Sequence, residues 1–427
     1  MINYIEVGRG IERDRFYRVA LEGGCAVALW RLPHAEQAEG VMDLSGHAPR
    51  PIAFNAGDPG FVVSPFESKL EKVPFIAADF WLRGDACFSA ERVASNGRSA
   101  HADKKNRGAD VLQTLRTKVG ARNGMNGLMS WYAGEDVSSK RTVSTSQEAF
   151  CGWVEQALKW IRRNELRKVV LSRILEVGLP KAFHPVDLFE KLCSAYPSAF
   201  VSLVAIPGLG TWIGATPELL LSLRNNELTT VALAGTRPVN PKNRQWPKQW
   251  SKKEIVEQAI VSDFIRECFA AQKLDFHEGK TQSVRIGDLL HLKTKFSLKN
   301  VSRMTRPQVE NFLYGLHPTP AVCGVPQRDA LAFIKERETH ERALYAGYLG
   351  PVEVGGETNL FVNLRCLQMR QSSALLYAGC GITIDSIPRQ EWLETDLKLN
   401  ALLKLLPAYY ERSESARSTE SKILCHD

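Results

Sequence analysis

The sequence lacks most features that mark secreted, disulfide-bonded, zinc-binding or membrane proteins. Its nine cysteines are scattered, with no CxxC pair and no Cys/His spacing typical of a zinc site. An odd number of cysteines without a framework indicates reduced thiols and predicts a cytoplasmic protein. No run approaches about 18 apolar residues, the length that a membrane-spanning helix needs. Residues 1–16 show no signal-peptide pattern, so we expect neither export nor a membrane partner.

The chain also lacks a strong charge of one sign. Among its 427 residues, 55 Lys and Arg stand against 47 Asp and Glu, a formal net charge of +8. The densest basic run, at residues 101–122, has no interleaved aromatic residues. We therefore expect a solvated surface there and no nucleic-acid partner. A mildly positive protein of this size suits a small anionic substrate.

The length of the apolar patterns in the sequence changes near residue 145. Residues 1–145 hold short apolar runs between polar loops, which predict strands at Cys25–Leu32, Gly60–Pro65 and Phe75–Leu82. Longer patterns run through residues 146–410, beginning with Thr145 and Glu148 in the spacing of a capping box before a helix. Residues 411–427 are rich in Ser, Glu, Arg and Lys, and we expect a disordered tail. We interpret 1–145 as a mostly β part of the same fold as 146–410.

Strands outnumber helices beyond residue 145 and often follow one another directly. This order predicts a mixed, largely antiparallel α+β fold rather than a doubly wound parallel sheet. The predicted strands are Lys168–Arg173, Ala199–Ile206, Thr211–Gly214, Leu219–Leu223, Leu228–Ala234, Ala346–Glu353, Leu360–Met369 and Ala374–Ile384. The predicted helices, besides the one after Thr145, are Pro185–Tyr196, Lys252–Ala271, Arg328–Ile334 and Gln390–Leu405.

Two pairs of glutamates are candidate metal ligands. Glu254 and Glu257 lie three residues apart in one predicted helix, so both carboxylates face the same way. Glu391 and Glu394 repeat this spacing in another helix. Two such pairs suit one partly hydrated Mg²⁺. From spacing alone, an exposed helix face explains each pair better.

Two further residues are candidates for acid–base chemistry. Lys168 opens an apolar strand, and a buried lysine can lose its proton near neutral pH and act as a base. Glu218 follows Gly214-Ala215-Thr216-Pro217 at a turn between two predicted strands, where catalytic carboxyls are common. The alternatives, which are commoner, are a strand-end lysine reaching solvent and a surface glutamate.

Taken in order, nine segments resemble the chorismate-utilising enzyme family, which includes anthranilate, aminodeoxychorismate, salicylate and isochorismate synthases. The resemblance covers roughly residues 145–406 and reverses the preference for the simpler alternatives. The segments are KVVLSR (Lys168–Arg173), GATPELLLSL (Gly214–Leu223), LAGTRP (Leu233–Pro238), KEIVEQ (Lys253–Gln258), LLHLKT (Leu289–Thr294), LHPTPAVCG (Leu316–Gly324), NLRC (Asn363–Cys366), AGCGI (Ala378–Ile382) and EWLETDLK (Glu391–Lys398).

The resemblance implies a single large α+β domain built on two facing antiparallel sheets, with helices outside and the active site between the sheets. It implies that Glu257 and Glu394 hold Mg²⁺ directly, while Glu254 and Glu391 support its waters. The substrate would be chorismate. Its expected contacts are Gly235, Thr236, His291, Ala321, Val322, Arg365, Gly379, Gly381 and Lys398, of which Arg365 and Lys398 hold the pyruvyl carboxylate.

Two positions indicate the reaction within that family. Relatives that add ammonia carry Gln where this chain has Lys168, and the covalent lysine of aminodeoxychorismate synthases is replaced by Ala234. Lys168 then suits a base that activates water, and Glu218 an acid for the leaving hydroxyl. We expect an isochorismate synthase of the menaquinone type, a monomer without an amidotransferase subunit. The alternatives are a salicylate synthase, a siderophore-pathway isochorismate synthase and, from another class, a non-catalytic nucleic-acid-binding protein.

One departure from the family pattern is Gln258, where many relatives carry His.

Overall fold

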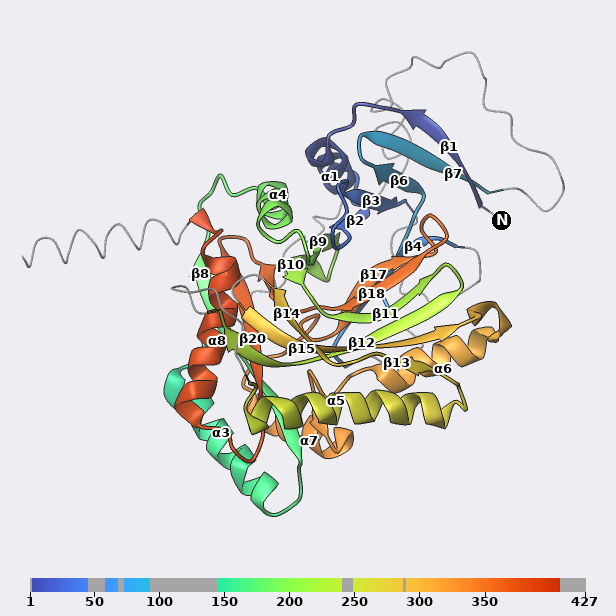
Figure 1. The fold of residues 1–427 in the computed structure, drawn as a ribbon. Helices are drawn as coiled ribbons and strands as arrows, with labels where there is room; N and C mark the ends of the chain where they lie inside the picture. The colour runs from blue at the N-terminus through green and yellow to red at the C-terminus, as the bar shows by residue number, and fades with distance from the viewer. Residues whose placement is uncertain are drawn as a thin grey trace, which may run out of the picture.

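The computed structural model describes residues 2–44, 58–67, 73–92, 144–239, 249–286 and 289–407. The basic run at 101–122 and the tail at 411–427 lie outside the described residues. Within them, two antiparallel sheets face one another and helices cover their outer sides (Figure 1). The predicted α+β class and the paired sheets are confirmed.

The first sheet combines strands from both ends of the chain. All its neighbouring strands pair antiparallel. Its eleven strands lie in the order β1 (Ile2–Gly8), β7 (Ala86–Arg92), β6 (Phe80–Arg83), β3 (Glu39–Asp43), β2 (Ala26–Arg31), β9 (Phe200–Ile206), β10 (Gly210–Thr216), β19 (Cys366–Met369), β20 (Ser373–Ile382), β8 (Lys168–Gly178) and β16 (Gly324–Val325).

The second sheet is formed mainly by the middle of the chain. Here too every described pair is antiparallel. Its order is β13 (His277–Glu278), β15 (Leu289–Lys299), β12 (Glu227–Pro238), β11 (Leu219–Arg224), β18 (Thr358–Val362), β17 (Tyr348–Val352), β4 (Gly60–Ser64) and β5 (Phe75–Ala77), with β14 (Gln282–Ile286) also paired to β15.

Helices cover the outer faces of both sheets. Helix α5 (Lys252–Ala271) packs on β12 and β15 and on α6 (Arg306–Leu316), below the second sheet in Figure 1. Helices α1 (Arg13–Glu22) and α4 (Pro185–Ala195) cover the first sheet, α8 (Pro388–Leu403) packs on β20 and α3 (Gln147–Arg162), and α7 (Gln327–Arg337) lies against β8. A short 3-10 turn spans Val301–Arg303. None of the described helices has the length and apolarity to cross a membrane.

An aromatic stack joins the two sheets at the centre of the core. Trp30 of β2 contacts Phe61 of β4 with ring centroids 5.3 Å apart, and Phe200 of β9 stacks on Phe361 of β18 at 4.2 Å. Phe61 and Phe200 complete the chain of rings at 6.5 Å. A second apolar cluster lies between the first sheet and α1 and α4. Strands such as β2 are therefore buried on both faces, which explains their continuous apolar runs. The boundary at residue 145 stays a prediction, although strands before residue 92 lie in both sheets.

Three predicted elements differ from the structure. The predicted strand Phe75–Leu82 is two strands, β5 and β6, which lie in different sheets. The predicted strand Leu360–Met369 is two strands, β18 and β19, which lie in different sheets. The chain changes sheet next to Arg365, whose positive φ of 47° ends the extended run. The predicted capping residue Thr145 is also wrong by one position. Ser146 accepts the hydrogen bond from Ala149 N at 3.2 Å, while Thr145 Oγ1 accepts one from Ile174 N.

Candidate active site

A cavity opens where β8, β12, β15 and β20 meet the N-terminal half of α5 and helix α8. Its void, counted together with the open solvent at its mouth, is about 740 Å³. The wall includes all but three of the predicted site residues. Those in the wall are Glu218, Gly235, Thr236, Glu257, His291, Ala321, Val322, Arg365, Gly379, Gly381, Glu394 and Lys398.

The three predicted residues outside the wall lie close behind it. Lys168 is 0% exposed, and its Nζ forms an ion pair with Glu257 Oε1 at 3.0 Å. Glu254 accepts hydrogen bonds from Ser251 at the start of α5 and from Arg237, at 3.1 Å to Nε and to Nη2. Glu391 is buried and ion-paired with Lys253. The predicted base and the two predicted supporting glutamates thus do not line the cavity in this structure.

Gly381 allows the Lys168–Glu257 pair to lie against strand β20. A Cβ added to Gly381 would lie 2.4 Å from Glu257 Oε1 and 2.8 Å from Lys168 Cε. Both distances are shorter than any ordinary Cβ contact. The pair therefore occupies the space that any larger side chain at this position would take.

Glu218 is a buried carboxyl in the cavity wall. It sits in the turn between β10 and β11, where its backbone N–H contacts Thr216 Oγ1 and its carbonyl accepts from Val362 N at 2.9 Å. Burial raises its pKa to about 7, although Lys168, Lys398 and Arg365 act in the opposite direction. Such a carboxyl can donate a proton near neutral pH.

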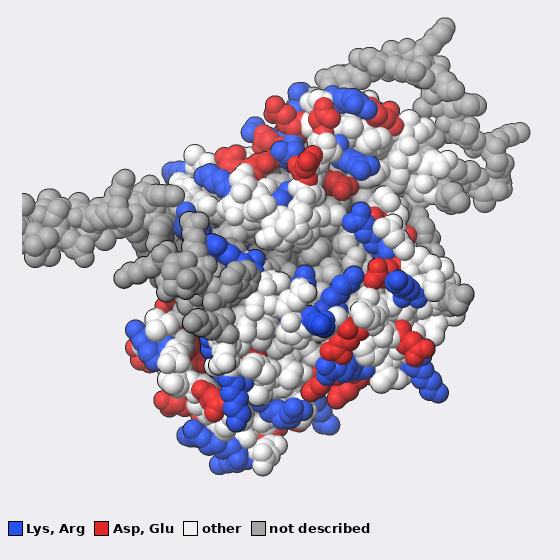
Figure 2. Space-filling view, in the orientation of Figure 1, with Lys and Arg blue, Asp and Glu red and all other residues white. Residues whose placement is uncertain are grey.

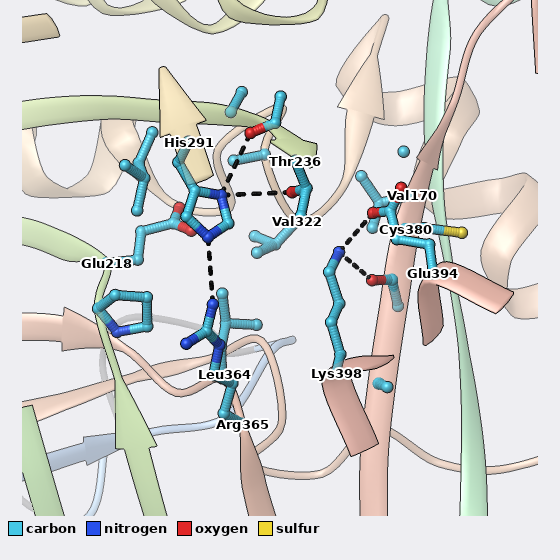
Figure 3. Close-up of a pocket in the computed structure, with 18 of the residues that line it drawn as sticks. Val170, Glu218, Thr236, His291, Val322, Leu364, Arg365, Cys380, Glu394 and Lys398 are labelled. Carbon is cyan, nitrogen blue, oxygen red and sulfur yellow. Dashed lines mark hydrogen bonds and ion pairs between the residues drawn. The ribbon is translucent and has the colours of Figure 1, made fainter. Parts of the chain in front are cut away.

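His291 has a defined tautomer because one neighbour can only donate. Arg365 Nη2 lies 3.2 Å from His291 Nε2, so Nε2 accepts, and Nδ1–H donates to Gly235 O at 3.2 Å or to Thr236 Oγ1 at 3.3 Å. Burial, together with Arg365 and Lys398, lowers the pKa of His291 well below its usual value. Figure 3 shows this neutral imidazole between Thr236 and Arg365, with Glu218 beside it.

Two cations face the cavity from opposite sides. Lys398 of α8 donates to Gly379 O and to Glu394 Oε1, each at 2.8 Å. Across the cavity, the Arg365 side chain contacts the neutral His291, and burial lowers the Arg365 pKa to about 10, which leaves it charged at neutral pH (Figure 3). A charged guanidinium held against a neutral ring suits a carboxylate ligand.

The carboxylates near α5 and α8 fit a hard divalent cation of the partly hydrated kind. Glu257 and Glu394 line the cavity, and Mg²⁺ typically takes one or two carboxylates plus water and substrate oxygens. Buried Glu391 also keeps one oxygen, Oε2, without a hydrogen-bond partner. Within the described residues, no group of three or more His, Cys, Asp or Glu is close enough to form a complete protein cage. The lysine partners of these glutamates balance their charge here.

Burial and ion pairing act in opposite directions on two of these glutamates. Burial alone would raise the pKa of Glu257, but the ammonium of Lys168, with Lys253 and Lys398 nearby, holds it below its usual value. The pKa of Glu391 is instead raised, because burial outweighs its pairing with Lys253. Glu257 is thus the better candidate for a permanently ionised ligand.

Several functional residues were missed from the sequence. Tyr345 and Tyr377 line the cavity and stack with ring centroids 5.3 Å apart, yet neither belongs to a chemically suggestive spacing. Lys253 was missed although it precedes Glu254, because its partner Glu391 is 138 positions away along the chain. The departure at Gln258 now has a structural account. The amide oxygen of Gln258 accepts from Ala234 N at 3.0 Å, and its amide nitrogen donates to Thr294 Oγ1 at 2.9 Å. These two bonds hold α5 against β12 and β15 beside Glu257.

A family model described as "Chorismate binding enzyme" matches residues 101–407. The chain belongs to the chorismate-binding enzyme family. Relatives include the isochorismate synthase EntC of Escherichia coli, 29% identical over 272 residues that are 62% of this chain and 69% of the relative. The isochorismate synthase MenF of Haemophilus influenzae is 30% identical over 270 residues, 62% of this chain and 61% of the relative.

Solved structures of this family share the fold. MenF, the menaquinone-specific isochorismate synthase from Escherichia coli, superposes with a TM-score of 0.72 at 20% identity, covering 95% of this chain and 94% of that one. Anthranilate synthase component I from Streptococcus pneumoniae gives a TM-score of 0.60 at 20% identity, covering 84% of each chain. The shared fold therefore extends into the strands before residue 92.

Proposed function

We propose that this chorismate-binding enzyme is an isochorismate synthase, which converts chorismate and water reversibly into isochorismate. The observation that carries the proposal is Glu218, a buried carboxyl with a pKa of about 7 in a cavity that also presents Arg365 and Lys398. An acid that is protonated near neutral pH suits the departure of the C4 hydroxyl. The names of the relatives, which are isochorismate synthases, support the same reaction.

In this proposal Lys168 is the base and Glu218 the acid. Lys168 lies on β8 directly behind the cavity wall, and its Nζ contacts Glu257. To take a proton from the attacking water, Nζ must exchange that contact for the water beside C2. Glu218 gives its proton to the C4 oxygen as the carbon–oxygen bond breaks, so that water is consumed and released in equal amounts.

The two carboxylates of the substrate are assigned to separate parts of the cavity. We assign the pyruvyl carboxylate to Arg365 and Lys398, helped by the backbone at Gly379 and Gly381, and place the ring beside Ala321 and Val322. The neutral His291, which contacts Arg365, lines the cavity with Gly235 and Thr236.

We propose Mg²⁺ as the cofactor, held by Glu257 and Glu394, with Glu254 and Glu391 acting through neighbouring groups. When bound, it would neutralise the ring carboxylate and draw negative charge as the hydroxyl leaves. Glu257 and Glu394 come from α5 and α8, so the site depends on the packing of these two helix ends.

We further propose a cytoplasmic monomer that works without an amidotransferase subunit and supplies menaquinone synthesis. On the face shown in Figure 2, basic and acidic side chains are interspersed. Relatives also include a vibriobactin-specific isochorismate synthase of Vibrio cholerae, 28% identical over 273 residues. Growth of a deletion strain that is restored by menaquinone, and not by a catechol siderophore, would support the menaquinone assignment.

A product assay tests the reaction. Purified protein is incubated with chorismate and Mg²⁺, products are separated by chromatography, and pyruvate is followed with lactate dehydrogenase. Isochorismate without pyruvate, lost on chelation, is expected. Salicylate with an equal amount of pyruvate would instead identify a salicylate synthase, and unchanged chorismate would refute the proposal.

A variant tests the role of the base. Lys168→Ala is expected to abolish conversion while binding chorismate with nearly unchanged affinity, measured by calorimetry without Mg²⁺. Lys181→Ala, at an exposed lysine beyond the end of β8, is the matched control and should keep wild-type turnover. Wild-type turnover by Lys168→Ala would show that another group removes the proton.

A further inference from the structure

Strand β8, which carries Lys168, is only partly covered on one of its edges. Strand β20 pairs with β8 from Val169 to Gly178, whereas β16 pairs with it only at Lys168 and Val169. Beyond Val169, no described strand continues the ladder on that second edge. Backbone groups left unpaired in the interior are costly, so this edge needs other partners.

Two side chains bind this edge between the backbone bond from Val170 N to Cys323 O and the bonds that Ser144 and Thr145 make further along. Arg342 Nη2 donates to Val170 O at 2.7 Å, and Glu338 Oε1 accepts from Ser172 N, also at 2.7 Å. A third bond runs from Arg342 Nη1 to Val322 O at 2.8 Å. Glu338 and Arg342 therefore bind the backbone of β8 and of the segment around Val322 at the same time.

The two side chains form a closed ion pair, here called the Glu338–Arg342 clasp. Nε and Nη2 of Arg342 contact the two carboxylate oxygens at 2.8 Å and 2.6 Å, and both side chains are at most 3% exposed. Burial would raise the pKa of Glu338, but Arg342 holds it below its usual value. The guanidinium also lies 4.4 Å from the Phe66 ring. The geometry is that of a planar, bidentate pair, which a lysine cannot reproduce.

What the clasp holds is the wall of the catalytic cavity. Val170 and Val322 both line the cavity, and Val170 lies two positions after Lys168, on the same face of β8. Ser172 is the register partner of Gly379, another wall residue. Both clasp residues also border a second hollow, together with Phe66 and Ala343. The bonds from Arg342 to Val170 O and Val322 O tie two parts of the cavity wall to each other.

We propose that Glu338 and Arg342 are positioning residues for the hydration of chorismate. They fix Lys168 and Val170 on one strand against Val322 on the facing segment, and so set where the base lies relative to the substrate ring. This role rests on the proposed function. Neither side chain lines the catalytic cavity, and both act through the backbone atoms that they bind.

Two variants test the clasp. Arg342→Lys keeps the charge but cannot make the four contacts of the guanidinium. Glu338→Gln keeps the shape but removes the negative charge and one of the two oxygens that Arg342 binds. Because a misplacement of about 1 Å can cost about 100-fold in rate, kcat is expected to fall about 10- to 100-fold. The KM for chorismate should stay within about threefold, because Arg365 and Lys398 lie elsewhere in the wall. If Arg342→Lys does not fold, Glu338→Gln carries the test.

The matched control is Arg266→Lys. Arg266 makes a similar two-bond pair with Glu278, at 2.8 Å and 2.7 Å, but on the surface. Its kcat is expected to equal that of the wild type. The second measurement is hydrogen–deuterium exchange of the peptide that spans residues 168–173, which should be faster in both clasp variants and unchanged in the control.

The possible results separate the role from the proposed function. A lower kcat at constant KM, together with faster exchange at 168–173, supports positioning. Folded variants that have a lower melting temperature but unchanged kcat and KM would show a purely stabilising pair and overturn the inference. If the wild type itself makes no isochorismate, the proposed function fails and this role fails with it. An active wild type with equally active variants overturns the role alone.

Discussion

Replacing Gly381 with alanine should remove activity while leaving the protein nearly as stable as before. The new Cβ would lie 2.4 Å from Glu257 Oε1, and contacts under 3.0 Å essentially never occur, so this oxygen must retreat by the difference, at least about 0.6 Å. Lys168 Cε, at 2.8 Å, must also move. Both atoms belong to the far ends of flexible side chains. The free energy of unfolding should therefore fall by about 1 kcal/mol, the low end of the range for an overpacked core.

The catalytic cost should be much larger than the stability cost. Glu257 is the proposed ligand for Mg²⁺ and Lys168 the proposed base, so one methyl group displaces both. A shift approaching 1 Å at a reacting group can cost about 100-fold. We expect kcat to fall by about that factor, measured by isochorismate formation, and the affinity for Mg²⁺, measured by calorimetry, to weaken in the same variant.

Gly178→Ala is the control for the Gly381 variant. Gly178 lies in β8, a strand of the same sheet, but no atom lies within 4 Å of its added Cβ. It should keep wild-type kcat and affinity for Mg²⁺. Wild-type kcat in a folded Gly381→Ala protein would refute the placement of the base and the metal ligand against this glycine.

Three further predictions concern single groups. Glu218→Gln should lower kcat by about 100- to 10,000-fold. Because the Glu218 carboxyl is protonated below its pKa of about 7, wild-type kcat should fall as pH rises through 7, and a fall that persists in Glu218→Gln would contradict this assignment. Arg365→Gln should raise the KM for chorismate about 10- to 100-fold through the loss of about 1.5–3 kcal/mol of charged hydrogen bonding. An unchanged KM would exclude Arg365 from substrate binding. Mg²⁺ at about 100 times its Kd should stabilise the wild type by about 2.7 kcal/mol in thermal unfolding, but not Glu394→Gln. Glu155→Gln, at an exposed position of α3, should respond like the wild type.

Local sequence patterns were sufficient to predict the elements whose apolar residues follow a single pattern from end to end. The predicted helix Lys252–Ala271 has the bounds of α5, because a capping box at Ser251 starts it and its side chains repeat with helical period. The predicted strand Ala199–Ile206 corresponds to β9, because its run is apolar along nearly its whole length. Where the chain changes sheet at Arg365, no local pattern announced the break, since it depends on which sheet each half joins.

The ordered motifs were also sufficient to name most of the cavity wall. Residues as distant as Glu218, His291 and Lys398 were expected in one site from resemblance alone, and the structure places all three in its wall. Composition and spacing by themselves favoured surface positions for the glutamates. The resemblance succeeded because the order of the motifs along the chain identifies a shared fold. The spacing of residues within one helix carries no such information.

Tertiary structure decided the charge partners and the positions behind the wall. Lys168 is paired with Glu257, and Glu391 with Lys253, across 89 and 138 positions of the chain, and no local spacing predicts such contacts. The same holds for Glu338, which binds β8 across 166 positions. Burial sets the pKa of Glu218 and the tautomer of His291 follows from Arg365, because both depend on neighbours that only the folded chain brings together.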